Sequence, residues 1–444
     1  MPPLRLPARL RSPYDREIAR LAVPALGALI AEPLYVLTDT AIVGHLGTPQ
    51  LGGLAVASTV LLTLYTVFIF LAYGTTAAVS RLLGAGDERE AAHQAVQSLW
   101  LAVLVGVGLT VIGLVGADAL VDLMGAEGAV RANALLYLRI SLLGVPALLV
   151  VLAGTGYLRG LQDTRTPLAV AVGTGALNLV LEVALIYGAG LGLGASALTT
   201  VVAQYAGAAV YLWRIGRSVR RFDVDLRPHP TSLRRLGAVG RDLFVRTVAL
   251  RLALVVATAV ATRLGPTEVA AHQIGFEIWS ILALALDAIA IAGQAMVGRY
   301  LGAGRAGVAR GAGRRMIELG VAFGGAAGVV LFALRTVLPD LFTSDPAVAG
   351  LAAFVLAWVA VLQPVNAVAF VLDGILIGAG DMRFLAWAMA GAAAVFVPAA
   401  VAVAVVDAGI GWLWASLGLL MVTRAASLSV RFTGDRWLVL GAVR

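Results

Sequence analysis

Four polar residues in the first half of the chain lie within apolar stretches, at spacings suited to binding a small cation. Asn178 and Glu182 are four residues apart, so on a helix they present an amide and a carboxylate on one face. Asp39 and Thr200 lie in two other apolar stretches and would add a carboxylate and a hydroxyl. A charged group inside a membrane span costs about 2.5 to 3.5 kcal/mol on insertion scales, so each such group is a candidate functional residue. Together the four residues predict a site for a proton or a sodium ion.

Two further residues modify this prediction. Pro33 lies six residues before Asp39, where it removes a backbone hydrogen bond and favours a kink, so we expect a hinge there. Glu32 lies seven residues before Asp39, close to two helical turns, which places both carboxyl groups on roughly the same face. Two neighbouring carboxyl groups in a low dielectric cannot both be charged cheaply, which favours binding of a proton or cation.

The second half of the chain carries its own ionisable residues within apolar stretches. These second-half candidates are Arg246, Arg251, Glu277, Asp287 and Asp373. Because a buried arginine stays charged, we expect at least one pair between an arginine and a carboxylate. Such a pair is either a fixed salt bridge that holds the helices or a direct participant in coupling or substrate binding. The spacing does not distinguish the two.

Several kinds of chemistry are excluded by residues that the chain lacks. It has no cysteine, which rules out disulfides and thiolate metal sites, and no lysine, which rules out a P-loop for nucleotides. Its four histidines are scattered and form no metal-ligand or catalytic pattern. We therefore expect no enzyme activity and no cofactor beyond the coupling ion.

The elements that must hold these residues are membrane-spanning helices. Hydrophobic residues make up 60% of the 444 positions and charged residues 13%, whereas soluble domains carry about 25% charge. Twelve stretches are long and apolar enough to cross a bilayer. Their approximate centres are Leu29, Tyr65, Val107, Leu149, Val180, Ala206, Val255, Leu284, Val321, Val361, Ala393 and Leu419. The fold class is thus all-α and polytopic.

Arginines mark one side of this membrane protein, because positive loops resist translocation. They gather in alternate short segments: 5–20, 81–89, 159–165, 214–241, 299–315, 383 and 424–444. The intervening loops hold few arginines and several acids. We expect both termini in the cytoplasm, an uncleaved N-terminal leader and a multi-pass protein of the inner membrane. This placement in loops also argues against nucleic-acid binding.

The two halves of the chain repeat one another at a constant shift of 218 positions. The shift places Gly47 on Gly265, Pro146 on Pro364 and Asp163 on Asp381. Each half holds six expected spans, an even number, so the halves are related by an axis along the membrane normal. The expected domains are residues 1–217 and 237–444, joined by a cytoplasmic linker loop at 218–236.

The candidate site does not repeat. Under the shift, Asp39 falls on Ala257, while Asn178 and Glu182 fall on Phe396 and Ala400. A purely architectural role would more naturally recur in both halves. The alternative interpretation remains open, namely that Asp39 and Glu182 only fix helix packing, with Arg139 as a counter-ion.

Four segments resemble the DinF-like branch of the MATE exporters. They are PLYVLTDTAIVGHLG at 33–47, GLQDTRTP at 160–167, AHQI at 271–274 and LDGILIGAGD at 372–381. The resemblance implies a MATE/MOP-type fold of two six-helix lobes. It also implies an ion site at Asp39, Asn178, Glu182 and Thr200, with Tyr137 nearby. The family usually has Asp where this chain has Glu182, and Glu32 is not typical of it.

We therefore predict a monomeric antiporter that exports cationic or amphipathic organic compounds in exchange for protons or sodium. A lipid-linked precursor flippase of the same superfamily is the alternative. Such a carrier is expected to line its cavity with several arginines and often adds two helices. Neither feature is present here.

Overall fold

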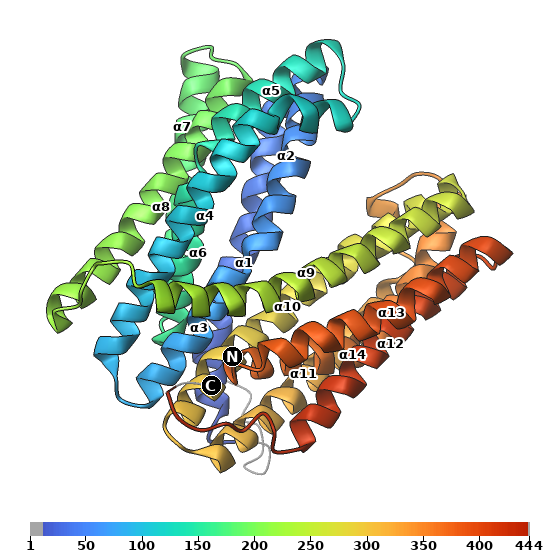
Figure 1. The fold of residues 1–444 in the computed structure, drawn as a ribbon. Helices are drawn as coiled ribbons and strands as arrows, with labels where there is room; N and C mark the ends of the chain where they lie inside the picture. Colours follow the sequence, from blue (N-terminus) through green and yellow to red (C-terminus); the bar gives the residue numbers. More distant parts are fainter. Residues whose placement is uncertain (1–11, 443–444) are drawn as a thin grey trace, which may run out of the picture. The chain divides into compact units, whose positions relative to one another are not determined.

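A computed structural model describes residues 12–442, except the side chains of residues 64, 66 and 67. Within that range every regular element is a helix (Figure 1). The first eleven residues of the expected leader, and Arg444, lie outside the described range.

Two compact units divide the chain. The N-unit comprises residues 27–244, and the C-unit comprises residues 12–26 together with 245–442. The helices wholly within the N-unit are α2 (Thr48–Phe68), α3 (Phe70–Gly84), α4 (Glu88–Leu123), α5 (Gly128–Leu142), α6 (Val145–Gly160), α7 (Arg165–Val183), η2 (Ala184–Gly188) and α8 (Leu193–Phe222). Those wholly within the C-unit are α10 (Pro266–Gly302), α11 (Ala306–Leu334), η3 (Leu338–Leu341), α12 (Pro346–Gly378), α13 (Met382–Val406) and α14 (Ile410–Thr433).

Two helices belong to both units, which differs from the expected division of the chain. The first turns of α1 (Asp15–Gly44) group with the C-unit, and the first half of α9 (Pro230–Leu264) groups with the N-unit. The start of α1 is bound by two polar contacts: Arg315 Nε donates to Asp15 Oδ1 at 2.7 Å, and the Tyr300 hydroxyl donates to Glu17 at 2.5 Å. The segment 218–236, expected as a loop, is largely the end of α8 and the start of α9.

Each of the twelve expected stretches lies on a helix or on a pair of helices. Ten helices are long and apolar enough to cross a membrane, and the bent pair α5 and α6 makes an eleventh if it is one span. The stretch centred near Tyr65 corresponds to α2 and α3, which are separated at Ile69.

Helix starts follow from local sequence. Asp87 caps α4 by accepting a hydrogen bond from the Glu90 amide at 2.9 Å, and Asp345 caps α12 by accepting one from Ala347 at 2.8 Å. In each unit a glycine with positive φ, Gly47 in one and Gly265 in the other, precedes the next helix. A residue with a side chain would be strained at that conformation.

The backbone confirms the internal repeat at the same 218-residue shift. Gly86 and Gly304 both have positive φ, of 81° and 73°, and so do Gln162 and Gly380, at 63° and 74°. Helices α2 and α3 together cover the positions of α10, and α5 and α6 together cover those of α12. The two longest helices wholly within the C-unit, α10 and α12, are therefore each broken in two in the N-unit.

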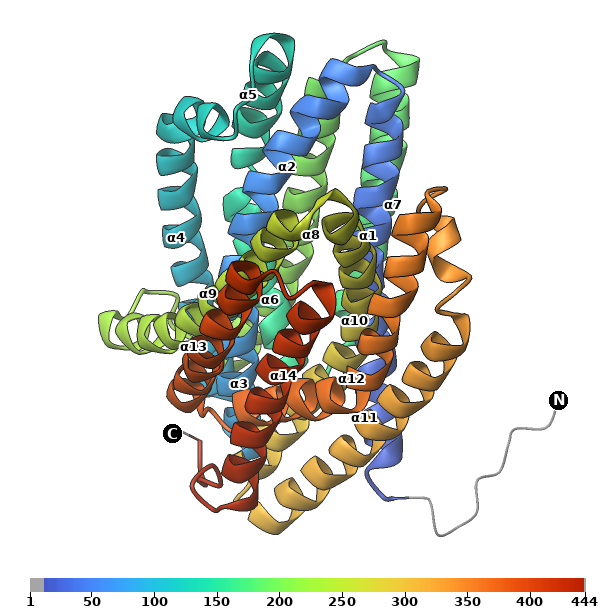
Figure 2. The same cartoon turned by 90° about the vertical axis from the view of Figure 1, so that its right-hand side faces the viewer.

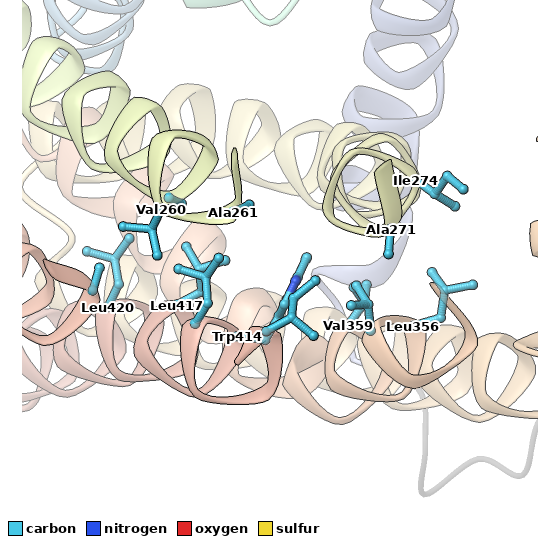
Figure 3. Close-up of a cluster of buried hydrophobic side chains, with 14 of the residues drawn as sticks. Val260, Ala261, Ala271, Ile274, Leu356, Val359, Trp414, Leu417 and Leu420 are labelled. Atoms are coloured by element: carbon cyan, nitrogen blue, oxygen red, sulfur yellow. The ribbon is translucent and has the colours of Figure 1, made fainter. Parts of the chain in front are cut away.

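Each unit has its own apolar core. In the C-unit α14 packs against α12 and α13, which Figures 1 and 2 show side by side. Figure 3 shows Val260 and Ala261 of α9 pointing toward Leu417 and Trp414 of α14. In the N-unit α7 and α8 pack against each other, and this contact forms the polar site described below.

Candidate functional site

The carboxyl groups of Asp39 and Glu182 face each other inside the N-unit. Asp39, on α1, is 6% exposed, and Glu182, near the end of α7, is 1% exposed. Neither carboxylate oxygen of Glu182 receives a hydrogen bond from a donor among the described residues. Two facing carboxylates repel unless a proton or a cation lies between them. The pair therefore has the chemistry of a cation carrier.

A set of hydroxyl and amide groups surrounds this pair. The Ser196 hydroxyl donates to Asp39 Oδ1 at 2.6 Å. Asn178 Nδ2 donates to the hydroxyls of Thr199 and Thr200 at 3.2 and 3.3 Å. Both threonines in turn donate to the Ser196 carbonyl, at 2.8 and 3.1 Å. These bonds fix the first turns of α8 against α7 beside the two carboxyl groups.

Two tyrosines complete the site. The Tyr35 hydroxyl shares a 2.7 Å hydrogen bond with the Thr200 hydroxyl, and it lies one turn before Asp39 on α1. Tyr137 on α5 is 4% exposed, and its hydroxyl faces those of Thr200 and Ser196. The site thus draws on α1, α5, α7 and α8.

The chain is irregular directly after Glu182. Helix α7 ends at Val183 and continues as the π-helical turn Ala184–Gly188. Such turns are rare and frequently occur at functional sites.

The structure brings together four of the predicted residues, namely Asp39, Asn178, Glu182 and Thr200, and places Tyr137 beside them. Glu32 is not part of this group. It is exposed, and its carboxylate accepts a hydrogen bond from Tyr65 of α2 at 3.0 Å. Pro33 is exposed in a helix that continues without a break to Gly44.

Sequence reasoning missed Tyr35, Ser196 and Thr199. The spacing of these residues could have indicated that they share a helix face with the site. Tyr35 lies four residues before Asp39, and Thr199 and Thr200 lie three and four residues after Ser196. Hydroxyl residues are common in apolar helices, which is why this signal is weak without the neighbouring helix.

Arg139 is not the counter-ion of this site. It pairs with Asp118 at 2.6 Å, and Arg131 also bonds Asp118, at 3.0 Å. Asp118 and Arg139 have half-exposed side chains, so they form a surface cluster between the end of α4 and the last turn of α5. Among the described residues, no cation neutralises Asp39 and Glu182.

In the C-unit the expected pair between an arginine and a carboxylate is confirmed. Arg246 Nε donates to Asp373 Oδ1 at 3.0 Å, and a second guanidinium nitrogen contacts Oδ2. Both side chains are 11% exposed. The Arg246 guanidinium thus neutralises Asp373. The Asp39 and Glu182 pair has no such positive charge beside it among the described residues.

Glu277 and Asp287 contact other residues. Glu277 is exposed and accepts a hydrogen bond from Gln273 at 2.8 Å, and Arg251 is exposed. Asp287 is half-buried and interacts with Arg424. The structure corrects the placement of Arg424 in a cytoplasmic segment: it lies within α14, is 3% exposed and stacks over Phe370 at 5.6 Å.

Among the residues that the structure describes, no group of three acidic or histidine side chains could hold a metal ion. The N-unit site offers two carboxyl groups, and its amide and hydroxyl donors are already engaged with one another or with Asp39. This arrangement suits a proton better than a divalent ion, which takes six or more oxygen ligands.

Comparison with known proteins gives one family. The sequence model of the family MatE matches the chain twice, over residues 24–184 and 244–402. These two ranges follow the internal repeat.

Two relatives and one solved structure are similar over most of their length. The chain is 33% identical to Protein DETOXIFICATION 44, chloroplastic, of Arabidopsis thaliana, over 84% of this chain and 74% of that one. It is 30% identical to DNA damage-inducible protein F of Escherichia coli (strain K12), over 94% and 91%. The outward-facing structure of a multidrug resistance MATE family transporter of the MOP superfamily superposes with a TM-score of 0.86, at 22% identity, over 96% and 97%.

Proposed function

Because this chain belongs to the MatE family of multi-pass membrane transporters, and its fold is the MATE/MOP fold, we propose that it is a proton-coupled antiporter. Members of this family are transporters and not enzymes. The proposed cargo is a cationic or amphipathic organic compound, in line with the multidrug resistance named for the similar structure.

The observation that carries the proposal is the contact between Asp39 and Glu182. Two buried carboxyl groups that face each other, with no arginine beside them in the part of the chain that the structure describes, need one added positive charge to coexist. A single proton meets that need without further ligands. Sodium would need several more oxygens, whereas the nearby hydroxyl groups are bonded to one another.

Ion binding must favour one conformation over another in order to drive export. Helix α1 is suited to convey this difference, because it carries Asp39 and Tyr35 into the site. It also contains Pro33, whose missing amide hydrogen removes one bond of the helix. We propose Pro33 as the hinge of this helix.

We propose that the protein lies in the inner membrane. The arginine-rich alternate segments support an orientation in which both termini face the cytoplasm. In that orientation protons enter as the organic compound leaves.

Ethidium transport by purified protein in liposomes tests the proposal. Wild-type protein should move ethidium under a proton gradient alone, and Asp39→Asn and Glu182→Gln should each lower that rate by more than about tenfold. Transport driven only by a sodium gradient would overturn proton coupling. Wild-type rates in both variants would overturn the role of the carboxyl pair.

A further inference from the structure

The N-unit holds a cavity of about 60 Å³ next to the Asp39 and Glu182 pair. We call this space the relay cavity. We propose that it is a water-filled proton path, and that Glu32 and Tyr65 form the end of the path farther from the Asp39 and Glu182 pair. The inference rests on the proposed proton coupling and adds the route that a proton takes to the site. The polar residues that line the cavity are Tyr65, Tyr137, Ser141, Thr200 and Gln204.

The lining of the relay cavity is mostly apolar, but two buried polar groups in it favour water. Ser141 is 5% exposed, and its hydroxyl has no hydrogen-bond partner among the described residues. The buried side-chain oxygen of Gln204 also lacks one within that part of the chain. A buried polar atom without a partner costs about 1 to 3 kcal/mol, which an ordered water removes. At roughly 15 to 30 Å³ for each water, the cavity holds about two to four.

The inner end of the cavity meets the ion site. Tyr137 and Thr200 line the cavity and also belong to the group around Asp39. Thr200 bonds Tyr35, and Ser196, which Tyr137 faces, bonds Asp39 directly at 2.6 Å. A proton on a cavity water is therefore separated from the Asp39 carboxylate only by hydroxyl groups.

The outer end of the cavity meets an exposed acid. Tyr65 lines the cavity and donates its hydroxyl hydrogen to Glu32 at 3.0 Å. Glu32 lies at the surface of the N-unit, and the relay requires that water reaches it there. Glu32, Tyr35 and Asp39 occupy positions i, i+3 and i+7 of α1, so one face of this helix follows the route.

Each transfer along the route conserves protons. Glu32 takes a proton from bulk water and donates it to the Tyr65 oxygen while Tyr65 passes its own hydroxyl proton to a cavity water. That water releases a proton toward Tyr137 and Thr200, and the last transfer places one on the Asp39 and Glu182 pair. Glu32 is neutral only while it carries the proton, the cavity water is a hydronium ion only between two transfers, and the Asp39 and Glu182 pair alone keeps the added positive charge.

The relay predicts a loss of rate without a loss of substrate binding. Glu32→Gln and Tyr65→Phe should each slow proton-driven ethidium transport by roughly tenfold, a modest share of what a positioned proton-transfer group contributes. Glu32→Asp should restore most of the rate. Ethidium exchange between equal concentrations, with no proton gradient, should stay at the wild-type rate in all three variants. Glu127→Gln, which removes an exposed carboxylate at the start of α5, is the matched control.

Proton entry is followed in the same liposomes with trapped pyranine, in H₂O and in D₂O. Slower pyranine acidification in Glu32→Gln, with a larger solvent isotope effect than in wild type, supports the relay. Wild-type rates and isotope effects in both Glu32→Gln and Tyr65→Phe overturn it. Equal loss of exchange and of proton-driven transport also overturns it, because Glu32 would then act in substrate binding.

The two proposals fail in different ways. If wild-type protein shows no proton-driven transport, the proposed function fails. If wild type is proton-driven and Asp39→Asn is inactive while Glu32→Gln is normal, only the relay fails.

Discussion

Arg246 and Asp373 form a two-point contact in the C-unit, with both side chains 11% exposed. In the N-unit the facing acids Asp39 and Glu182 have no such partner among the described residues. Because the guanidinium already neutralises Asp373, we expect that this carboxyl group does not exchange a cation.

Replacing Arg246 should expose this difference. Arg246→Gln leaves Asp373 buried and unpaired, so we expect a loss of stability of about 3 kcal/mol, and the double variant with Asp373→Asn should be less affected than the single one. Melting in detergent measures both. Sodium chloride should also stabilise Arg246→Gln more than choline chloride does, and wild type should show no such preference. Arg263→Gln, which changes an exposed arginine, is the control. Equal melting temperatures of wild type, the single variant, the double variant and the control would contradict the prediction.

The hydroxyl of Ser196 should matter for transport. Ser196→Ala removes the 2.6 Å hydrogen bond to Asp39, and a bond to a charged group contributes about 1.5 to 3 kcal/mol. We expect proton-driven ethidium transport to fall by about tenfold or more. Thr59→Val removes an exposed hydroxyl that bonds only within its own helix, and should leave the rate unchanged. An unchanged rate in Ser196→Ala would show that this bond does not influence coupling.

Two glycines at equivalent positions should be equally intolerant of a side chain. A Cβ at Gly156 would meet the Ala72 carbonyl oxygen at 2.5 Å, and one at Gly374 would meet the Ala290 carbonyl oxygen at 2.4 Å. Both belong to a Gly-x-x-x-Gly pattern that lets helices approach closely. Gly156→Ala and Gly374→Ala should each cost about 1 to 3 kcal/mol, measured by thermal melting.

The matched controls for these glycines are Gly173→Ala and Gly391→Ala, which are also 218 positions apart. A Cβ at either position meets nothing within 4 Å. Melting temperatures should therefore stay unchanged or rise slightly, because alanine favours a helix. If all four variants melt alike, the close helix contact is not a determinant of stability.

Gln97 should hold the segment between α8 and α9 in place. It is fully buried, its Nε2 donates to the Arg227 carbonyl at 2.9 Å, and its Oε1 accepts the His229 amide at 2.8 Å. Gln97→Leu removes both bonds, so amide hydrogen exchange of residues 223–229 should become at least about tenfold faster. This corresponds to a decrease of about 1.4 kcal/mol in the free energy of local opening.

Gln94→Leu, one turn earlier on α4, is the control for Gln97, and the exchange of this segment should stay at the wild-type rate. If exchange in Gln97→Leu also matches wild type, other contacts hold the segment. The Trp100 indole, which donates to the Leu226 carbonyl at 2.7 Å, would then be the next to test.

The sequence by itself determined the membrane class, the helices and the internal repeat, because these depend on local composition and periodicity. The 218-residue shift also reappears in the backbone at Gly86 and Gly304, where the turn conformation is set by the residues themselves. Asp39, Asn178, Glu182 and Thr200 could be named because polar groups are costly in apolar helices, and because a family resemblance joined them.

Only the tertiary structure decided which polar groups meet. Glu32 and Asp39 share a helix face, yet Glu32 bonds Tyr65 of α2, while Asp39 meets Glu182 of α7. Arg424 lies near the end of the last span in the sequence, but packing places it against Asp287 and Phe370. Such pairings depend on how neighbouring helices are rotated and spaced. The packing of small and large side chains sets that rotation, and a periodic pattern along one helix does not contain it.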